Sequence, residues 1–310
     1  MSASFASALN AARDAAGSQH YPQGALYVVA TPIGNLADIS LRALHVLALA
    51  DTVACEDTRH TQALLRAYGI DKVAAQLLAL HQHNESEAAQ TVIGRLRTGQ
   101  RVAYASDAGT PAVSDPGARL VAAVQAAGLQ AIALPGASSV TAALSVAGAV
   151  NTRADDSGFV FAGFVPTKAT ERDAAVQALA AEPRTVVLLE APHRIEALAR
   201  ALAALGARPV TLAREITKQF EQVVTLAADA LPGWLAADAQ RLRGEFVVVL
   251  HPAPRAPDDT TAQDAATRRV LTLLLAELPV KTAVKLAAEL TGAPRNALYE
   301  QALALKNAEH

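Results

Sequence analysis

The chain has 310 residues, of which 52% are hydrophobic and 18% are charged, and its formal net charge at pH 7 is −2. This length is typical of about two domains with a sizeable buried core, which excludes a short peptide and a disordered acidic tail. The near-neutral balance argues against a histone-like or polybasic coat protein, although one local basic face suffices to bind nucleic acid. The single cysteine, Cys55, excludes an internal disulfide framework and a four-cysteine zinc site.

The start of the chain shows no targeting segment. Residues 1–20 lack the basic start and the continuous apolar stretch of a secretory signal. The longest uncharged stretch, residues 120–152, is interrupted by glutamine, proline, glycine and serine, so it lacks the roughly 20 consecutive apolar residues of a membrane span. We therefore expect a soluble cytoplasmic protein that begins with a flexible arm over residues 1–23.

Residues 24–147 are expected to form a first α/β domain. Short apolar runs typical of strands alternate with segments of helical spacing, one of which contains Leu41 and Leu44 after a capping Asp38 or Ser40. The expected strands cover residues 26–30, 52–55, 77–80, 102–104 and 132–134. This alternation predicts a mostly parallel sheet covered by helices. Polar clusters follow the strands, and the carboxyl edge of such a sheet is where ligands bind.

Residues 148–252 are expected to form a second α/β domain with more antiparallel pairing. Its expected strands cover residues 159–164, 185–189, 210–213 and 245–250, with a helix over residues 168–181. We interpret residues 253–266, which contain several Pro and Asp residues, as a linker. Residues 267–310 are expected to form a small helical module in which basic residues outnumber acidic ones.

The loop over residues 106–117 (SDAGTPAVSDPG) is the most informative segment. Two glycines and two prolines directly after an expected strand fix an unusual backbone path and let a ligand approach the main chain closely. Asp107 and Asp115 add acceptor oxygens, which suit a cationic ligand with hydroxyls and an amino acid tail. The alternative is an ordinary turn, but a plain turn rarely needs so many special residues in a row.

Two further loops follow strands. Residues 31–36 (TPIGNL) have neither the Gly-rich nucleotide fingerprint nor the Lys-Ser/Thr ending of an ATPase, which disfavours both usual nucleotide motifs. Residues 135–139 (PGASS) open an expected helix, where small residues would let backbone N–H groups close on a ligand, and a bare helix cap is an equal alternative. The histidines have no recognised metal spacing, so we expect no metal site.

Six motifs occur in the order of one known family: residues 30–36, 56–59 (EDTR), 83–85 (HNE), 106–117, 192–194 (PHR) and 214–218 (REITK). Together they resemble the ribosomal RNA small subunit methyltransferase I family, which has the tetrapyrrole methylase fold of class III S-adenosylmethionine-dependent methyltransferases. The resemblance implies two α/β domains with a cofactor cleft between them, plus a small C-terminal helical module. It implies S-adenosylmethionine as cofactor, a homodimer, and 2′-O-methylation of a cytidine ribose in the decoding centre of 16S rRNA within the small ribosomal subunit.

The resemblance also implies a set of cofactor-binding residues. By fold analogy, the methionine part of the cofactor would lie against the loop that contains Asp107, with two serines nearby and the loop of residues 31–36 as the opposite wall. The residues so implied are Pro32, Gly34, Asp107, Gly109, Thr110, Pro111, Ala112, Val113, Ser138 and Ser139.

A ribose hydroxyl is a poor nucleophile while it keeps its proton, so a base or a stabilising cation is expected. The catalytic candidates are Glu56, Asp57, His83 and Lys218, with Glu85 as a further acceptor and Arg214 as a further cation. The sequence does not select the base among them. A structural ion pair between Asp57 and Arg59 is an equal alternative to catalysis.

RNA binding requires contacts to phosphates. Arg59, His193, Arg194, Arg214 and Lys218 all follow expected strands and would form a positive rim at the cleft, unless each is simply a solvated surface charge. Two other functions stay open: a methyltransferase of the same fold that acts on a tetrapyrrole precursor, and a noncatalytic ribosome-assembly factor. The segments 192–194 and 214–218 and the helical module favour RNA.

Overall fold

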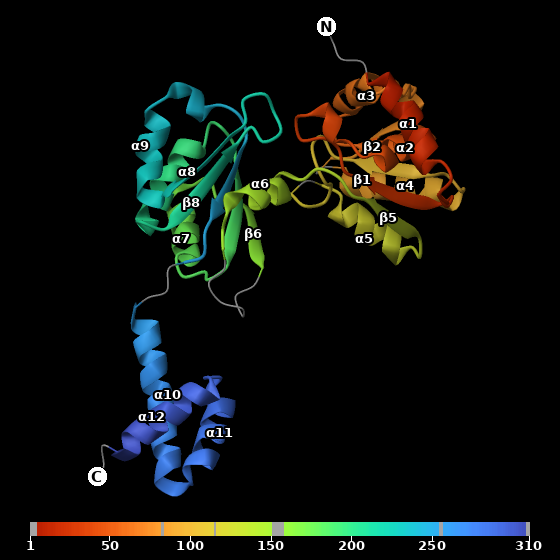
Figure 1. Ribbon diagram of the computed structural model, residues 1–310. Helices are drawn as coiled ribbons and strands as arrows, with labels where there is room; N and C mark the ends of the chain where they lie inside the picture. Colours follow the sequence, from red (N-terminus) through yellow and green to blue (C-terminus); the bar gives the residue numbers. More distant parts are fainter. Residues whose placement is uncertain (1–4, 82–83, 115, 151–157, 254–256, 308–310) are drawn as a thin grey trace. The chain divides into compact units, whose positions relative to one another are not determined.

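The computed structural model describes residues 5–81, 84–114, 116–150, 158–253 and 257–307. The chain divides into two units, Met1–Ala253 and Pro254–His310. The first unit holds two five-stranded sheets, and the second consists of helices (Figure 1). No helix in the described part of the chain is long and apolar enough to span a membrane.

The first sheet is parallel in every pair of its strands, as the sequence predicts. Its order is β3 (Leu77–Ala79), β2 (Thr52–Cys55), β4 (Val102–Ala105), β1 (Ala25–Val29) and β5 (Gln130–Leu134). Residues of α1 (Ala6–Ala16), α2 (Leu41–Leu49) and α3 (Thr58–Ala67) pack in one core cluster, and those of α4 (Glu85–Arg97) and α5 (Ala118–Ala126) in another. Both faces are therefore covered, which explains why β2 and β4 are buried along their whole length.

The flexible arm expected over residues 1–23 is wrong for the residues that the structure describes. Residues Ala6–Ala16 form helix α1, whose Ala12 and Ala16 are buried against α2 in the core. Tyr21 is also buried and its hydroxyl donates to the carbonyl of Ala16 at 3.1 Å. The buried residues of α1 are alanines, which let helices approach closely but give little hydrophobic periodicity to the sequence.

The second sheet mixes parallel and antiparallel strands, which confirms the prediction of more antiparallel pairing. Its order is β6 (Phe159–Phe164), β7 (Thr185–Glu190), β10 (Phe246–Leu250), β8 (Pro209–Arg214) and β9 (Gln222–Ala227). Only β6 and β7 run parallel; β10 is antiparallel to β7 and β8, and β8 to β9. Helices α7 (Ala169–Leu179), α8 (Ile195–Leu202) and α9 (Leu231–Ala236) share one core cluster on this sheet.

Helix α6 (Ser139–Ala147) packs on the other face of the second sheet, although the sequence division at residue 147 assigned it to the first domain. Its Val140, Ala143 and Ala147 are buried against Val187 and Val249. In addition, the Thr211 hydroxyl donates to the carbonyl of Ala147 at 3.2 Å. The chain therefore changes sheets directly after β5, and the expected boundary at 147/148 lies one helix too late.

The second unit contains α10 (Pro257–Glu277), α11 (Val280–Thr291) and α12 (Arg295–Asn307), which share a core that includes Leu271, Val284 and Leu298. The linker expected over residues 253–266 is wrong from residue 257 onward, because α10 already begins there. Short 3-10 helices cover Leu36–Asp38, Ala74–Gln76, Ala203–Leu205, Ala228–Ala230 and Ala239–Leu242.

Candidate functional site

The loops that follow β1 and β4 are joined by an isolated antiparallel bridge between Thr31 and Gly109. The Thr31 N–H donates to the Gly109 carbonyl at 2.9 Å, and the Gly109 N–H donates back at 3.1 Å. The buried Thr31 hydroxyl also donates to the Ser106 carbonyl at 3.1 Å. The two loops singled out in the sequence therefore form one fixed unit at the carboxyl edge of the first sheet.

A third loop, before α6, is tied to the same unit. The Thr110 hydroxyl donates to the Ala137 carbonyl at 3.0 Å. Gly136 lies so close to Ala30, the residue directly after β1, that an added Cβ would meet the Cβ of Ala30 at 2.9 Å. Gly109 has φ +84°, and a Cβ there would lie 3.1 Å from Cγ2 of Ile33. The glycines therefore allow three loops to meet within a space that side chains would fill.

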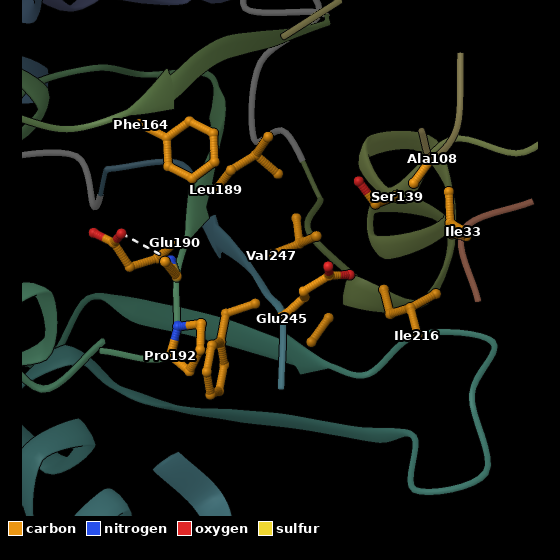
Figure 2. A pocket seen from close by; sticks show the side chains of 13 residues that line it. Ile33, Ala108, Ser139, Phe164, Leu189, Glu190, Pro192, Ile216, Glu245 and Val247 are labelled. Carbon is orange, nitrogen blue, oxygen red and sulfur yellow. Dashed lines mark hydrogen bonds between the residues drawn. The ribbon is translucent and has the colours of Figure 1, made fainter. Parts of the chain in front are cut away.

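A cavity of about 320 Å³ lies between these loops and the second sheet (Figure 2). Ile33 and Ala108 line it from the loops, and Ser139 lines it from the start of α6. The lining from the second sheet and its loops comprises Phe164, Leu189, Glu190, Ala191, Pro192, Ala213, Ile216, Glu245, Phe246 and Val247. A mostly apolar wall with a few polar groups is typical of small-molecule sites, whose volumes are about 300–1,000 Å³.

The residues expected to bind the cofactor lie in the loops around this cavity, but only Ser139 is part of its lining. Ser138 lines a neighbouring, more open cavity of about 420 Å³ together with Ile33 and Thr217. Pro32 and Pro111 are buried, whereas Val113 is exposed and Ala112 has an unusual φ of +66°. Nine of the ten predicted side chains therefore lie outside the cavity's lining, and their role in binding a cofactor stays a prediction.

The acidic residues after β2 and β4 are held together. The Asp107 N–H donates to Glu56 Oε1 and the Asp57 N–H donates to Asp107 Oδ1, each at 3.4 Å. Asp57 also caps α3, since its Oδ1 accepts from the Arg59 N–H at 2.8 Å, and its Oδ2 pairs with the Arg59 guanidinium at 2.8 Å. These hydrogen bonds hold the pKa of the Asp57 carboxyl far below its usual range. Asp57 is therefore a poor proton acceptor near neutral pH.

Only part of the motif at residues 83–85 is described by the structure. His83 lies outside the described residues. Glu85 is buried, and its Oε1 accepts from the Gly117 N–H at 3.1 Å while Oε2 lies 3.9 Å from the Arg119 guanidinium. Glu85 therefore fixes the end of the loop over residues 106–117. Across the described ranges, no group of three or more His, Cys, Asp or Glu side chains is placed to hold a metal ion.

Most side chains expected to form a positive rim have internal partners. Arg59 pairs with Asp57, and Arg194 pairs with Glu190 at 3.0 Å and donates to the Val165 carbonyl. The Arg214 guanidinium donates to the Arg243 carbonyl at 3.0 Å and to the Gln240 carbonyl at 3.2 Å. Lys218 is also paired, as described next, while His193 is exposed. To bind phosphate, each paired cation must exchange or share an internal contact.

Lys218 connects the turn after β8 to the first sheet's loops. Its Nζ donates to Glu215 Oε1 at 2.9 Å and to Glu245 Oε2 at 3.1 Å. Partial burial disfavours the ammonium charge, but these hydrogen bonds outweigh burial and raise the pKa of Lys218. Its methylene stem lies over Gly34, where an added Cβ would be 2.5 Å from Lys218 Cγ. Lys218 is therefore a charged side chain that connects two carboxylates, Glu215 and Glu245, with the loop that contains Gly34.

Two protein-family models match this chain. The model of the tetrapyrrole (corrin/porphyrin) methylases matches residues 25–232, and that of the RsmI C-terminal HTH domain matches residues 261–306. The ribosomal RNA small subunit methyltransferase I of Pseudomonas aeruginosa is 48% identical over 282 residues, which cover 90% of this chain and 97% of that protein. The protein of the same name from Neisseria meningitidis serogroup B is 46% identical, with 92% and 94% covered. The chain belongs to the ribosomal RNA small subunit methyltransferase I family.

Solved structures share the fold of this family member. A cobalamin biosynthetic enzyme, cobalt precorrin-4 methyltransferase, superimposes with a TM-score of 0.54 at 20% identity, covering 74% of this chain and 98% of that one. Diphthine synthase gives a TM-score of 0.54 at 17% identity, covering 73% and 90%. The prediction of the family and of its tetrapyrrole methylase fold is therefore confirmed.

Glu245 and Glu190 line the cavity of this methyltransferase but were not among the site residues predicted from the sequence. The predicted ligand contacts are polar residues that follow strands, whereas Glu245 precedes β10. Because β10 is antiparallel to β7 and β8, its first residue Phe246 pairs with Glu190 and Arg214, the last residues of those strands. Glu245 thereby reaches the same edge from the opposite chain direction. Glu190 ends β7 and was identifiable by the rule that found Glu56.

Proposed function

We propose that this chain transfers a methyl group from S-adenosylmethionine to the 2′-hydroxyl of a cytidine ribose in the decoding centre of 16S rRNA. The observation that supports it most is the 46–48% identity, over nine-tenths of the chain, to proteins named ribosomal RNA small subunit methyltransferase I. The cavity at the edge of both sheets agrees with a small-molecule cofactor held beside a larger substrate. The substrate would be the rRNA within the small ribosomal subunit, and the site of action the cytoplasm.

The residues around the cavity fit S-adenosylmethionine. The apolar side chains Leu189, Ala213 and Val247 offer a wall for a flat adenosine group. Gly109 and the bridged backbone of residues 106–113 leave the main chain open to the amino acid tail. In this proposal Pro32, Gly34, Asp107, Gly109–Val113, Ser138 and Ser139 form the cofactor site, as the family resemblance implies. When bound, the cofactor supplies a methyl group on a positively charged sulfur.

The protein's part in the transfer is to position the ribose hydroxyl and to accept its proton. Holding the hydroxyl oxygen roughly 3 Å from the methyl carbon contributes several kcal/mol through orientation alone. Among the catalytic candidates, Asp57 is committed to Arg59 and to capping α3, whereas Glu56 and Lys218 remain at the edge of the site. His193, Arg194, Arg214, Arg59 and Lys218 are proposed to contact RNA phosphates, the paired ones by sharing their present partners.

A labelling experiment tests the proposal. Purified protein is incubated with tritiated S-adenosylmethionine and either small ribosomal subunits from a strain that lacks this gene or a tetrapyrrole precursor. We expect label only in 16S rRNA, and nuclease digestion with mass spectrometry should find one new 2′-O-methylcytidine. Label in the tetrapyrrole alone would overturn the proposal in favour of a small-molecule methyltransferase. Subunit binding with no transfer and no calorimetric heat with the cofactor would indicate a noncatalytic assembly factor.

We further propose that the protein acts as a homodimer, as the resemblance implies. Light scattering coupled to gel filtration should give twice the 32.1 kDa of one chain. A mass equal to one chain across micromolar concentrations would reject the dimer without affecting the methyltransferase proposal.

A further inference from the structure

Several carboxylates lie near the cavity, and they differ in how strongly they are engaged by neighbouring groups and in how open they are to the cavity and to solvent. Asp57 is held ionised by Arg59, and Glu85 is buried against the Gly117 N–H, so both are committed to structural contacts. Glu190 is only 3% exposed and faces Arg194. Glu245 differs from all three, because it lines the cavity while its side chain is 75% exposed. It alone among these four combines access to the cavity with access to solvent.

The direction of the Glu245 side chain supports this distinction. Figure 2 shows its carboxylate projecting between Val247 and Ile216 toward the side of the cavity formed by Ser139 and Ile33, whereas the carboxylate of Glu190 points the other way. Ile33 belongs to the loop of residues 31–36, and Ser139, the first residue of α6, is among the residues that the proposed function assigns to the cofactor. Glu245 therefore faces the loops beside which the methyl group would be transferred.

Glu245 shares its cationic partner with a second carboxylate. Two carboxylates, Glu215 and Glu245, share the single ammonium of Lys218. Glu215 Oε1 also accepts from the Glu245 N–H at 3.0 Å, so Glu215 is fully engaged and partly buried. Glu245 Oε2 accepts from Lys218, and within the described residues we find no donor to its Oε1. Partial burial disfavours the charged form of Glu215, but the hydrogen bonds from Lys218 and from the Glu245 N–H outweigh burial and lower the pKa of Glu215, which makes Glu215 a poor proton acceptor.

The backbone around this trio is held in an unusual conformation. Glu215 and Thr217 have φ of +52° and +68°, a backbone conformation that residues other than glycine rarely adopt and that is therefore strained. The Glu215 N–H donates to the Glu245 carbonyl at 3.0 Å. Gly244 approaches so closely that a Cβ there would lie 2.4 Å from Glu215 Cγ. The strained turn thus places Lys218 where it can orient Glu245.

On the basis of the proposed function, we infer that Glu245 is the catalytic base that takes the proton of the ribose 2′-hydroxyl, and that Lys218 is a positioning residue that orients it. In the step, the O–H proton passes to Glu245 Oε1 and the hydroxyl oxygen forms a bond to the methyl carbon. The carbon–sulfur bond breaks with its electron pair left on sulfur, so S-adenosylhomocysteine and the 2′-O-methyl ribose are formed. The exposed side chain of Glu245 then releases the proton to solvent.

The test uses the full chain with the substitution Glu245→Gln, which keeps the size and one acceptor oxygen but cannot take the proton. Single-turnover transfer to small ribosomal subunits should slow by about 10²–10⁴-fold, the usual contribution of a general base. Calorimetric affinity for S-adenosylhomocysteine should stay within about threefold of wild type, because no cofactor contact is assigned to this carboxylate. The log of the residual rate should rise with pH where the wild-type rate is flat, since hydroxide must then take the proton.

Lys218→Met tests positioning, because methionine keeps an apolar stem over Gly34 but has no ammonium. It should lower the transfer rate less than Glu245→Gln and keep the wild-type form of the pH profile. Glu196→Gln on the exposed surface of α8 is the control and should transfer at the wild-type rate. If Glu245→Gln does not melt cooperatively, Glu245→Asp replaces it, with a partial rate loss and an unchanged pH profile expected.

The outcomes distinguish this inference from the proposed function. Wild-type protein that leaves 16S rRNA unlabelled rejects the function itself. Active wild-type protein together with a Glu245→Gln variant of equal rate rejects only the role of Glu245. A variant that loses cofactor affinity in proportion to its rate also rejects that role, since Glu245 would then be a cofactor contact.

Discussion

The stem of Lys218 covers Gly34 so closely that the glycine has no room for a side chain: an added Cβ would lie 2.5 Å from Cγ and 2.6 Å from Cε of the lysine. Gly34 has φ +142°, which also disfavours any residue with a Cβ. This contact joins the loop after β1 to the turn after β8. A loop of the first sheet and a turn of the second therefore touch through a lysine stem packed on a glycine.

Gly34→Ala should displace Lys218 and loosen its hold on Glu245. We expect methyl transfer to RNA to fall by at least tenfold. The melting temperature should fall only slightly, because Gly34 is exposed at the loop surface. Gly94→Ala is the matched control, since a Cβ at that position of α4 meets nothing within 4 Å. Alanine in a helix interior stabilises by about 0.5–1 kcal/mol relative to glycine, so the control should melt slightly higher and transfer normally. Equal rates for both variants would contradict the role of the contact.

Gly109→Val should abolish cofactor binding, measured by calorimetry with S-adenosylmethionine. At φ +84° a side chain is strained, and its Cβ would already lie 3.1 Å from Ile33 Cγ2 at the cavity's wall. Gly128→Val is the control that distinguishes backbone strain from a clash at the cofactor site, because Gly128 has a similar φ of +72° but open space around it. Both variants carry a backbone cost of order 1–3 kcal/mol, yet only the first should lose the cofactor. Normal affinity in Gly109→Val would remove this loop from the proposed cofactor site.

Much of the first sheet could be predicted because its strands and helix starts are marked by residues close together in the sequence. Apolar runs bounded by turn residues gave strands such as 52–55, and hydroxyl capping gave the start of α2, where the Ser40 hydroxyl accepts from the Ala43 N–H at 3.2 Å. Helix α1 could not be predicted in this way, because its contact depends on buried Ala12 and Ala16 rather than on a large apolar stripe.

The position of the loops beside the cavity could be predicted from the sequence, but the ion pairs between side chains could not. Motif resemblance predicts the loop around Gly109 as part of the site, and its role stays a prediction. Which cation meets which carboxylate depends on contacts between distant parts of the chain. Lys218 reaches Glu245 across 27 positions, and Glu245 belongs to the site only because β10 enters the sheet antiparallel to its neighbours. The residues of a strand do not by themselves determine whether it runs parallel or antiparallel to its neighbours in a mixed sheet.

Asp57 offers a test that separates a structural acid from a catalytic one. Asp57→Asn keeps an oxygen that can accept from the Arg59 N–H at the start of α3, so transfer should stay within about threefold of wild type if the residue only caps the helix. Asp57→Ala removes the cap and should lower the melting temperature. Differential scanning fluorimetry and single-turnover transfer measure the two effects. A loss of transfer in Asp57→Asn at an unchanged melting temperature would instead support a catalytic role.

Glu190 should make stability depend on pH in a definite direction. Burial raises the pKa of its carboxyl, and this outweighs the hydrogen bond from the Ala191 N–H and the nearby charge of Arg194. In the unfolded chain the carboxyl titrates near its ordinary pKa of about 4.3. The stability contributed by the protonated form is therefore fully present below about pH 4.3 and is lost as the pH rises through the folded pKa.

Glu190→Gln stays neutral at every pH, so its melting temperature relative to wild type should increase from pH 4 upward and level off above the folded pKa of Glu190. Each unit of pKa difference corresponds to about 1.4 kcal/mol of unfolding free energy. The exposed Glu196, in the first turn of the helix that follows, is the control, and Glu196→Gln should show a much flatter difference across the same range. A Glu190→Gln difference that falls with pH would mean that the ion pair with Arg194 outweighs burial, because the ionised carboxylate would then be the form that stabilises the fold.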